Sequence, residues 1–215
     1  MIRRLASMLL AAAVLAVAAP AAAPAATLPD GLQKITVTAA NWTTSYAVLS
    51  AWTTSGGKWV RALGPYQARL GYNGTAPVGQ ERENSGKTPA GTYGLGIMFG
   101  VKARPAGVTW PTWRIAHTYD KWDDDPASPR YNLWTDIRVH DAGVNPENMR
   151  TIPAYNYGIV IAYNTARTPG LGSAIFLHER HDGATAGCVS LPTADLLAVL
   201  RWLNSAVSPH IVIKA

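Results

Sequence analysis

The only cysteine of the chain lies in a segment whose residue types could carry out acyl transfer. Residues 175–192 read IFLHERHDGATAGCVSLP, and Cys188 follows His178 by ten positions. A free cysteine is mostly protonated at neutral pH, and a neighbouring base can convert it into the nucleophilic thiolate. A histidine at the end of one strand can approach a sulfur on the next strand, so the spacing is consistent with a Cys/His pair.

The residues before the cysteine could stabilise the negative charge that acyl transfer develops. Gly187 leaves room for a substrate carbonyl, and the backbone N–H groups of Gly187 and Cys188 could form an oxyanion hole. Two other interpretations of these residues stay open. One is a buried, inert cysteine beside a structural histidine. The other is a zinc site of His178, His181 and Cys188, for which the sequence supplies no suitable fourth ligand or general base.

The elements that must position these residues are mostly strands. Alternating segments are separated by Gly, Pro and Asn-Gly turns, which is typical of a β-rich chain. One helix is expected over residues 193–204, where Thr193 could cap the N-terminus and leucines recur at helical spacing. The sequence therefore predicts a mainly β (β-rich α+β) fold with one helix after the cysteine. The expected strands are 33–38, 46–52, 58–63, 66–72, 157–163, 174–178 and 211–213.

The first 26 residues have the three parts of a secretory signal peptide. Arg3 and Arg4 form a basic start, residues 5–19 are almost entirely apolar, and residues 23–25 (Ala-Pro-Ala) fit the small-residue rule for cleavage. A membrane anchor is the alternative, but the apolar run is short of the roughly 20 residues that a span needs. We expect residues 1–26 to be removed and the mature protein to be secreted or to lie in the cell envelope.

The rest of the chain, residues 27–215, contains no linker and is expected to form a single domain. It holds no other long apolar stretch, so we expect no membrane span in the mature protein. The whole chain has a formal net charge of +6, but its basic residues are scattered and form no run of five. A nucleic-acid partner is therefore not expected.

A long loop with three tryptophans, residues 100–130, is expected to be ordered and to border a binding site. It contains the acidic run Asp123, Asp124 and Asp125. We interpret this run as a solvated turn in preference to a calcium site.

Two segments in this order resemble those of a known family. Residues 185–189 (Thr-Ala-Gly-Cys-Val), with His178 upstream, resemble the active-site segment of the L,D-transpeptidase catalytic domain (the YkuD family). Residues 86–93 (Gly-Lys-Thr-Pro-Ala-Gly-Thr-Tyr) resemble the Thr-Pro-x-Gly-x-Tyr/Phe turn of that family. The resemblance is strongest over residues 80–213, and it implies a YkuD-like β-sandwich of mixed sheets with one helix after the cysteine.

Three departures from the family pattern concern the same segment. Ala186 stands where the family usually has a second histidine, and Ser190 stands where Arg or Asn is common. The gap between His178 and Cys188 is also shorter than usual. His178 nevertheless matches the histidine that the family uses as a base.

The resemblance implies a reaction. The Cys188 thiolate would attack the meso-diaminopimelate–D-alanine bond of a peptidoglycan tetrapeptide stem, with His178 as the base and Thr185 orienting the loop. Transfer of the thioester to an amine of another stem would form a 3→3 crosslink, with no metal or organic cofactor. The alternatives are an L,D-carboxypeptidase, which uses water as acceptor, and a non-catalytic peptidoglycan-binding domain.

Four residues are candidates for binding the stem peptide. Tyr155 and Tyr157 precede a strand expected beside His178, His140 follows another expected strand, and Ser190 lies two positions after the cysteine. His181 could replace the missing second histidine, but its polar surroundings favour a solvated loop residue.

Overall fold

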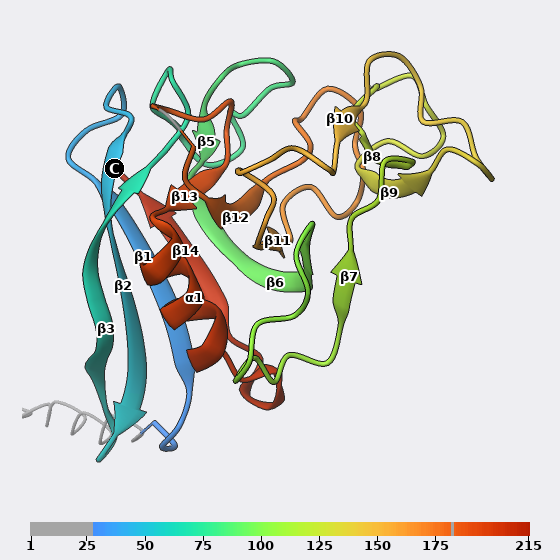
Figure 1. Cartoon of the computed structure of the whole chain (residues 1–215). Helices are drawn as coiled ribbons and strands as arrows, with labels where there is room; N and C mark the ends of the chain where they lie inside the picture. Colours follow the sequence, from blue (N-terminus) through green and yellow to red (C-terminus); the bar gives the residue numbers. More distant parts are fainter. Residues whose placement is uncertain (1–27, 182) are drawn as a thin grey trace, which may run out of the picture.

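The computed structural model describes residues 28–181 and 183–215 (Figure 1). The expected signal peptide, residues 1–26, lies outside the described residues. Among the helices of the described part, none is long and apolar enough to span a membrane.

Eight strands form a mixed sheet that closes on itself. Their order around the ring is β11-β12-β13-β3-β2-β1-β14-β6, and β6 pairs in turn with β11. The predicted mainly β fold is confirmed. The bounds of the eight strands are β1 (Gln33–Ala39), β2 (Tyr46–Ser55), β3 (Lys58–Arg69), β6 (Gly91–Gly100), β11 (Gly158–Ile161), β12 (Phe176–Glu179), β13 (Val189–Leu191) and β14 (His210–Lys214).

Alternation of apolar and polar residues determines which face of each strand is buried. In β1, Ile35 and Val37 are completely buried, whereas the threonines between and after them are less so. Strand β1 pairs in parallel with β14, whose Ile211 and Ile213 are also buried. Side chains on one face of neighbouring strands pack together, and these four residues belong to the main core cluster.

One difference from the sequence-based expectation concerns β3. Residues 58–63 and 66–72 were expected to form separate strands, but a single strand spans Lys58–Arg69. Its pairing with β2 shifts register opposite Gly64 and Pro65. Gly64 has a φ of 84°, and a Cβ there would lie 2.7 Å from the carbonyl oxygen of Leu49. The Gly-Pro pair therefore produces an irregularity within one strand and does not end it.

Helix α1 (Thr193–Trp202) follows β13 directly, as expected, and packs against β3, β12 and β13. The prediction that Thr193 caps the helix is wrong. Pro192 is the N-cap residue and provides no side-chain cap. Because Thr193 is already the first helical residue, its hydroxyl is free to donate to Oε1 of Glu179 on β12, at 2.7 Å.

A smaller sheet of three strands lies beside the barrel. It consists of β8 (Asp120–Asp123), β9 (Leu133–Asp136) and β10 (Glu147–Asn148), in the order β10-β8-β9. Figure 1 shows this sheet on the far side of β6 and β7 (Trp113–Ile115) from the β1–β3 edge. Residues 100–130, which were expected to form one long loop, therefore contain two strands, β7 and β8. A cluster of aromatic side chains joins the small sheet to the barrel: Phe99, Trp122, Trp134, Tyr155 and Phe176.

The interpretation of residues 123–125 as a solvated turn is wrong for two of the three. Asp123 is completely buried and accepts a hydrogen bond from Oγ of Ser128. Asp124 is half-buried, and only Asp125 caps an outer turn by accepting from the N–H of Ala127. In residues 28–181 and 183–215, no three His, Cys, Asp or Glu side chains are arranged so that they could hold one metal ion.

Candidate active site

Two neighbouring parallel strands place the proposed nucleophile and base on the wall of one cavity. In the register of β12 and β13, His178 lies opposite Ser190, and Cys188 immediately precedes β13. The sulfur accepts a hydrogen bond from the N–H of Phe176 and donates one to the carbonyl of Ala174, both at 3.3 Å. The start of β12 therefore fixes the position of the thiol.

Thr185 holds the loop that leads into Cys188. Its hydroxyl donates to the carbonyl of Cys188 at 2.6 Å and accepts from the N–H of Gly187 at 3.2 Å. Its backbone pairs with Leu70 and Tyr72, just after β3. The N–H of Gly187 is therefore occupied. The N–H of Cys188 makes no hydrogen bond to any residue that the structure describes, and it is free to face an oxyanion.

The segment 86–93 lies against the same loop. Two short strands, β4 (Thr75–Ala76) and β5 (Thr88–Pro89), pair in parallel beside it. The completely buried hydroxyl of Thr88 accepts from the N–H of Gly71 at 2.8 Å and donates to the carbonyl of Cys188 at 3.4 Å. A Cβ on Gly187 would lie 3.1 Å from the Lys87 carbonyl, so this position requires a small residue. The two sequence motifs thus form one structural unit.

His178 has a defined tautomer. Its Nδ1 lies 2.7 Å from the carbonyl oxygen of Glu179. A carbonyl can only accept, so Nδ1 carries the proton and Nε2 is left with the lone pair that a general base needs. The ring of Tyr155 packs edge-on against the imidazole, with 5.4 Å between the ring centroids.

Burial determines the charge of both groups. Desolvation lowers the pKa of His178 to about 4, although the carbonyls of Glu179 and Ala154 partly oppose this shift. Desolvation also raises the pKa of the Cys188 thiol to about 12, and the charge of Glu147 adds to this shift. Both groups are therefore uncharged at neutral pH, as expected for ionisable side chains that are buried.

Cys188 and His178 line a single cavity of about 370 Å³. Thr185, Gly187 and Tyr155 also line it. So do Ser190, which is 1% exposed, and the exposed His181.

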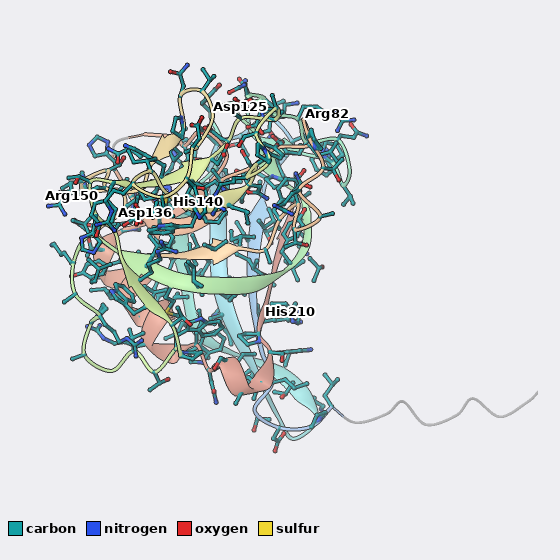
Figure 2. All side chains as sticks on the ribbon, turned by 90° about the vertical axis from the view of Figure 1, so that its right-hand side faces the viewer. Arg82, Asp125, Asp136, His140, Arg150 and His210 are labelled. Atoms are coloured by element: carbon teal, nitrogen blue, oxygen red, sulfur yellow. The ribbon has the colours of Figure 1, made fainter. Side chains whose placement is uncertain are left out.

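Two of the predicted binding residues do not line the cavity. Tyr157 is half-buried, and its ring packs against Trp113 and under the ammonium group of Lys102. His140 is exposed in the turn after β9, where its N–H donates to the carbonyl of Asp136 (Figure 2). Tyr157, one residue before β11, packs against the main core cluster, whereas the turn after β9 leaves His140 exposed to solvent.

Sequence reasoning missed three carboxylates that line the cavity, Glu83, Asp124 and Glu147. We call these three residues the acidic wall. They come from three separate segments, two loops and strand β10, and share no motif, so no spacing pattern could have grouped them. Only the acidic run around Asp124 gave a signal, and it was interpreted as a solvated turn.

Comparison with known proteins shows which family the chain resembles. The sequence profile of the L,D-transpeptidase catalytic domain (YkuD) matches residues 52–212. The structure is similar to crystal structures of the helical cell shape determining protein Pgp2 from Campylobacter jejuni and of a point mutant of it. Both are 14% identical to this chain, with TM-scores of 0.41 and 0.44, and cover 86% of it.

This chain spans about half the length of those Pgp2 chains, 49% and 47% respectively. No curated protein matches the sequence significantly. The profile match covers well over half of the chain and includes His178, Thr185, Gly187 and Cys188. The chain therefore belongs to the family of L,D-transpeptidase catalytic domains.

Proposed function

We propose that this protein is a secreted L,D-transpeptidase that uses Cys188 as nucleophile and His178 as general base. Membership of the family implies a peptidoglycan-modifying cysteine enzyme. The observation that supports the assignment to these two residues is that they line one cavity, with His178 on β12 and Cys188 one residue before its parallel neighbour β13. The predicted signal peptide supports action outside the cytoplasm, where peptidoglycan lies.

The first half-reaction forms a thioester. As the sulfur of Cys188 attacks the carbonyl carbon of the diaminopimelate–D-alanine bond, Nε2 of His178 takes the thiol proton. The oxyanion accepts a hydrogen bond from the N–H of Cys188. The carbon–nitrogen bond then breaks, and the imidazolium returns the proton to the amine of the departing D-alanine.

The second half-reaction reverses these roles. An amine of a second stem attacks the thioester carbonyl and loses a proton to Nε2, and the sulfur leaves and is reprotonated. A 3→3 crosslink and the free thiol result. If water attacks in place of the amine, the same site acts as an L,D-carboxypeptidase.

Because Cys188 and His178 are uncharged at rest, proton transfer must accompany attack. Thr185 supports this step indirectly, since its hydrogen bonds hold the Cys188 carbonyl and the Gly187 N–H in place. The ring of Tyr155 packs against one side of the imidazole and limits its movement. The reaction thus depends on an oriented, uncharged pair and needs no preformed ion pair.

Intact-mass measurement after incubation with a purified disaccharide-tetrapeptide tests the proposal. We expect an adduct equal to the donor minus D-alanine, with D-alanine released, and no adduct on Cys188→Ala. Crosslinked product with added acceptor stem identifies transpeptidation, whereas tripeptide product alone identifies the carboxypeptidase. A folded, reduced protein that forms no adduct and releases no D-alanine contradicts the proposal.

A further inference from the structure

The segment that contacts the sulfur of Cys188 has a backbone conformation that is unusual for its residue type. Ala174 has a φ of 53°, in the left-handed region that residues with a Cβ rarely adopt. Its carbonyl accepts a hydrogen bond from the thiol of Cys188, and the N–H of Phe176 donates one to the same sulfur. Such a conformation persists only where the surroundings hold it, so a contact from outside the segment is expected.

The side chain of Asn132 makes that contact. Its Oδ1 accepts a hydrogen bond from the N–H of Ala174 at 3.2 Å. Asn132 immediately precedes β9, and its own N–H donates to the carbonyl of Asp123 on β8 at 2.7 Å. Asn132 and Ala174 are 42 positions apart in the sequence. The small sheet therefore reaches the segment that holds the nucleophile.

Both polar atoms of the Asn132 side chain make two hydrogen bonds. Oδ1 also accepts from Nε1 of Trp122 at 2.9 Å. Nδ2 donates to the carbonyls of Tyr163 and Asn164 at 3.0 and 2.9 Å. These partners fix the orientation of the amide, because a flipped amide would place donors against donors. Asn132 is only 8% exposed, so it is a rigid, buried anchor for Ala174.

The residue type at position 132 meets two demands at once. Asn132 has a φ of 58°, also in the left-handed region. Asparagine adopts this region more readily than most residues with a Cβ. Glycine would adopt it as well but has no amide, and glutamine has the amide without the same conformational preference. Asparagine therefore supplies both the backbone conformation and the four hydrogen bonds.

A second contact holds the residue before Ala174. Oγ of Ser173 donates to Oε2 of Glu83 at 3.0 Å, and the hydroxyl of Tyr131 donates to the same carboxylate. Ser173 and Tyr131 are both buried. Because Tyr131 directly precedes Asn132, residues 131–132 hold residues 173–174 by two routes, one direct and one through Glu83.

We propose that Asn132 is a positioning residue for the nucleophile, because it holds Ala174 in the left-handed conformation from which Ala174 and Phe176 both bond to the sulfur of Cys188. The inference rests on the proposed function, since the position of the sulfur matters to the reaction only if Cys188 attacks the substrate. Asn132 does not line the cavity itself, so it acts through the backbone of residues 174–176.

Loss of the Asn132 amide should release the thiol from both partners at once. A residue with a Cβ leaves the left-handed region when nothing holds it there. The carbonyl of Ala174 and the N–H of Phe176 would then turn away from the sulfur. The thiol would occupy several rotamers, of which only some face the substrate carbonyl, and acylation would slow.

Infrared spectroscopy of the thiol tests the proposal. The chain has one cysteine, so the S–H stretching band comes from Cys188 alone. Asn132→Gly tolerates the left-handed conformation but lacks the amide. It should shift the band to the higher frequency of a thiol without an acceptor, and slow acylation by the tetrapeptide donor at least about tenfold. Asn145→Gly, at an exposed left-handed position (φ 51°) outside the cavity, is the matched control and should change neither.

A backbone substitution removes the same contact more selectively. Incorporation of lactate in place of Ala174 replaces its N–H with an ester oxygen and leaves the other three side-chain hydrogen bonds of Asn132 in place. It should shift the band and slow acylation as Asn132→Gly does, and it decides the question if Asn132→Gly does not fold. Adding Ala174→Gly to Asn132→Gly should recover part of both effects, because glycine adopts the left-handed region without a Cβ penalty.

The outcomes separate this proposal from the proposed function. If a folded Asn132→Gly or lactate variant keeps the band and the acylation rate of the wild-type protein, Asn132 has no positioning role and the function of Cys188 stands. A change in only one of the two quantities also overturns the role, since the position of the thiol and the reaction would then be unconnected. If no donor acylates the wild-type protein, the proposed function fails, and the band alone decides whether Asn132 holds the thiol.

Discussion

The protonation of Cys188 follows from its burial. With a pKa of about 12, only a small fraction of the thiol is ionised at pH 7. Alkylation by a neutral reagent such as iodoacetamide depends on the thiolate, so its rate should rise about tenfold per pH unit between pH 7 and pH 10. Mass spectrometry of timed samples measures this rate. A rate that levels off below pH 8 would instead indicate a thiolate already paired with a charged His178.

His178 should make the stability of the protein depend on pH. Its pKa is about 4 in the folded state against an ordinary value of 6.5, so between these values the unfolded state binds a proton that the folded state does not. The free energy of unfolding should therefore fall by about 3 kcal/mol as the pH drops from 7 to 4. Urea unfolding at both pH values measures the change. His178→Gln should lack this part of the pH dependence, and parallel curves for the two proteins would contradict the assignment.

The two-residue strand β5 connects the two sequence motifs. Thr88→Val removes the acceptor for the Gly71 N–H and the donor to the Cys188 carbonyl at a fully buried position. We expect the free energy of unfolding to decrease by about 1–3 kcal/mol, and acylation to slow because the Cys188 loop loses one of its anchors. Urea unfolding and acylation rates measure both effects. Thr88→Ser should keep most of the stability and of the acylation rate, and Thr118→Val, at an exposed position, should change neither. If Thr88→Val leaves both quantities unchanged, the contact is unimportant.

The aromatic cluster couples the barrel to the small sheet. Phe99 is completely buried on β6, and its ring packs edge-on against Trp134 of the small sheet and Phe176 of β12, with centroids 5.6 and 5.3 Å apart. Phe99→Ala should lower the free energy of unfolding by about 3–5 kcal/mol while unfolding stays a single transition. Fluorescence and circular dichroism followed in urea measure this. Val78→Ala, at an exposed position, is the control, and two separate transitions would show that the sheets unfold independently.

Local patterns in the chain were enough to predict its β character and its helix. Alternation over residues 33–38 and leucine spacing after residue 193 are local signals, and the structure follows both. Predictions from local patterns were wrong where a residue distant in sequence determines the local structure. Gly64 and Pro65 are typical of a turn, yet β2 holds them within one strand, and the hydroxyl of Thr193 bonds to Glu179 on another strand.

The Cys188–His178 pair could be proposed from the sequence because both residues lie within one short segment that carries a family pattern. The contact of Thr88 with that segment, the closure of β6 on β11 and the composition of the cavity depend on the tertiary structure. The acidic wall shows this most clearly, since its three carboxylates come from segments that are far apart along the chain. Residue types and spacing specify which groups can react. The protonation states of these groups and the side chains that surround them depend on the tertiary structure. The reason is that burial and contacts between distant segments arise only when the whole chain folds.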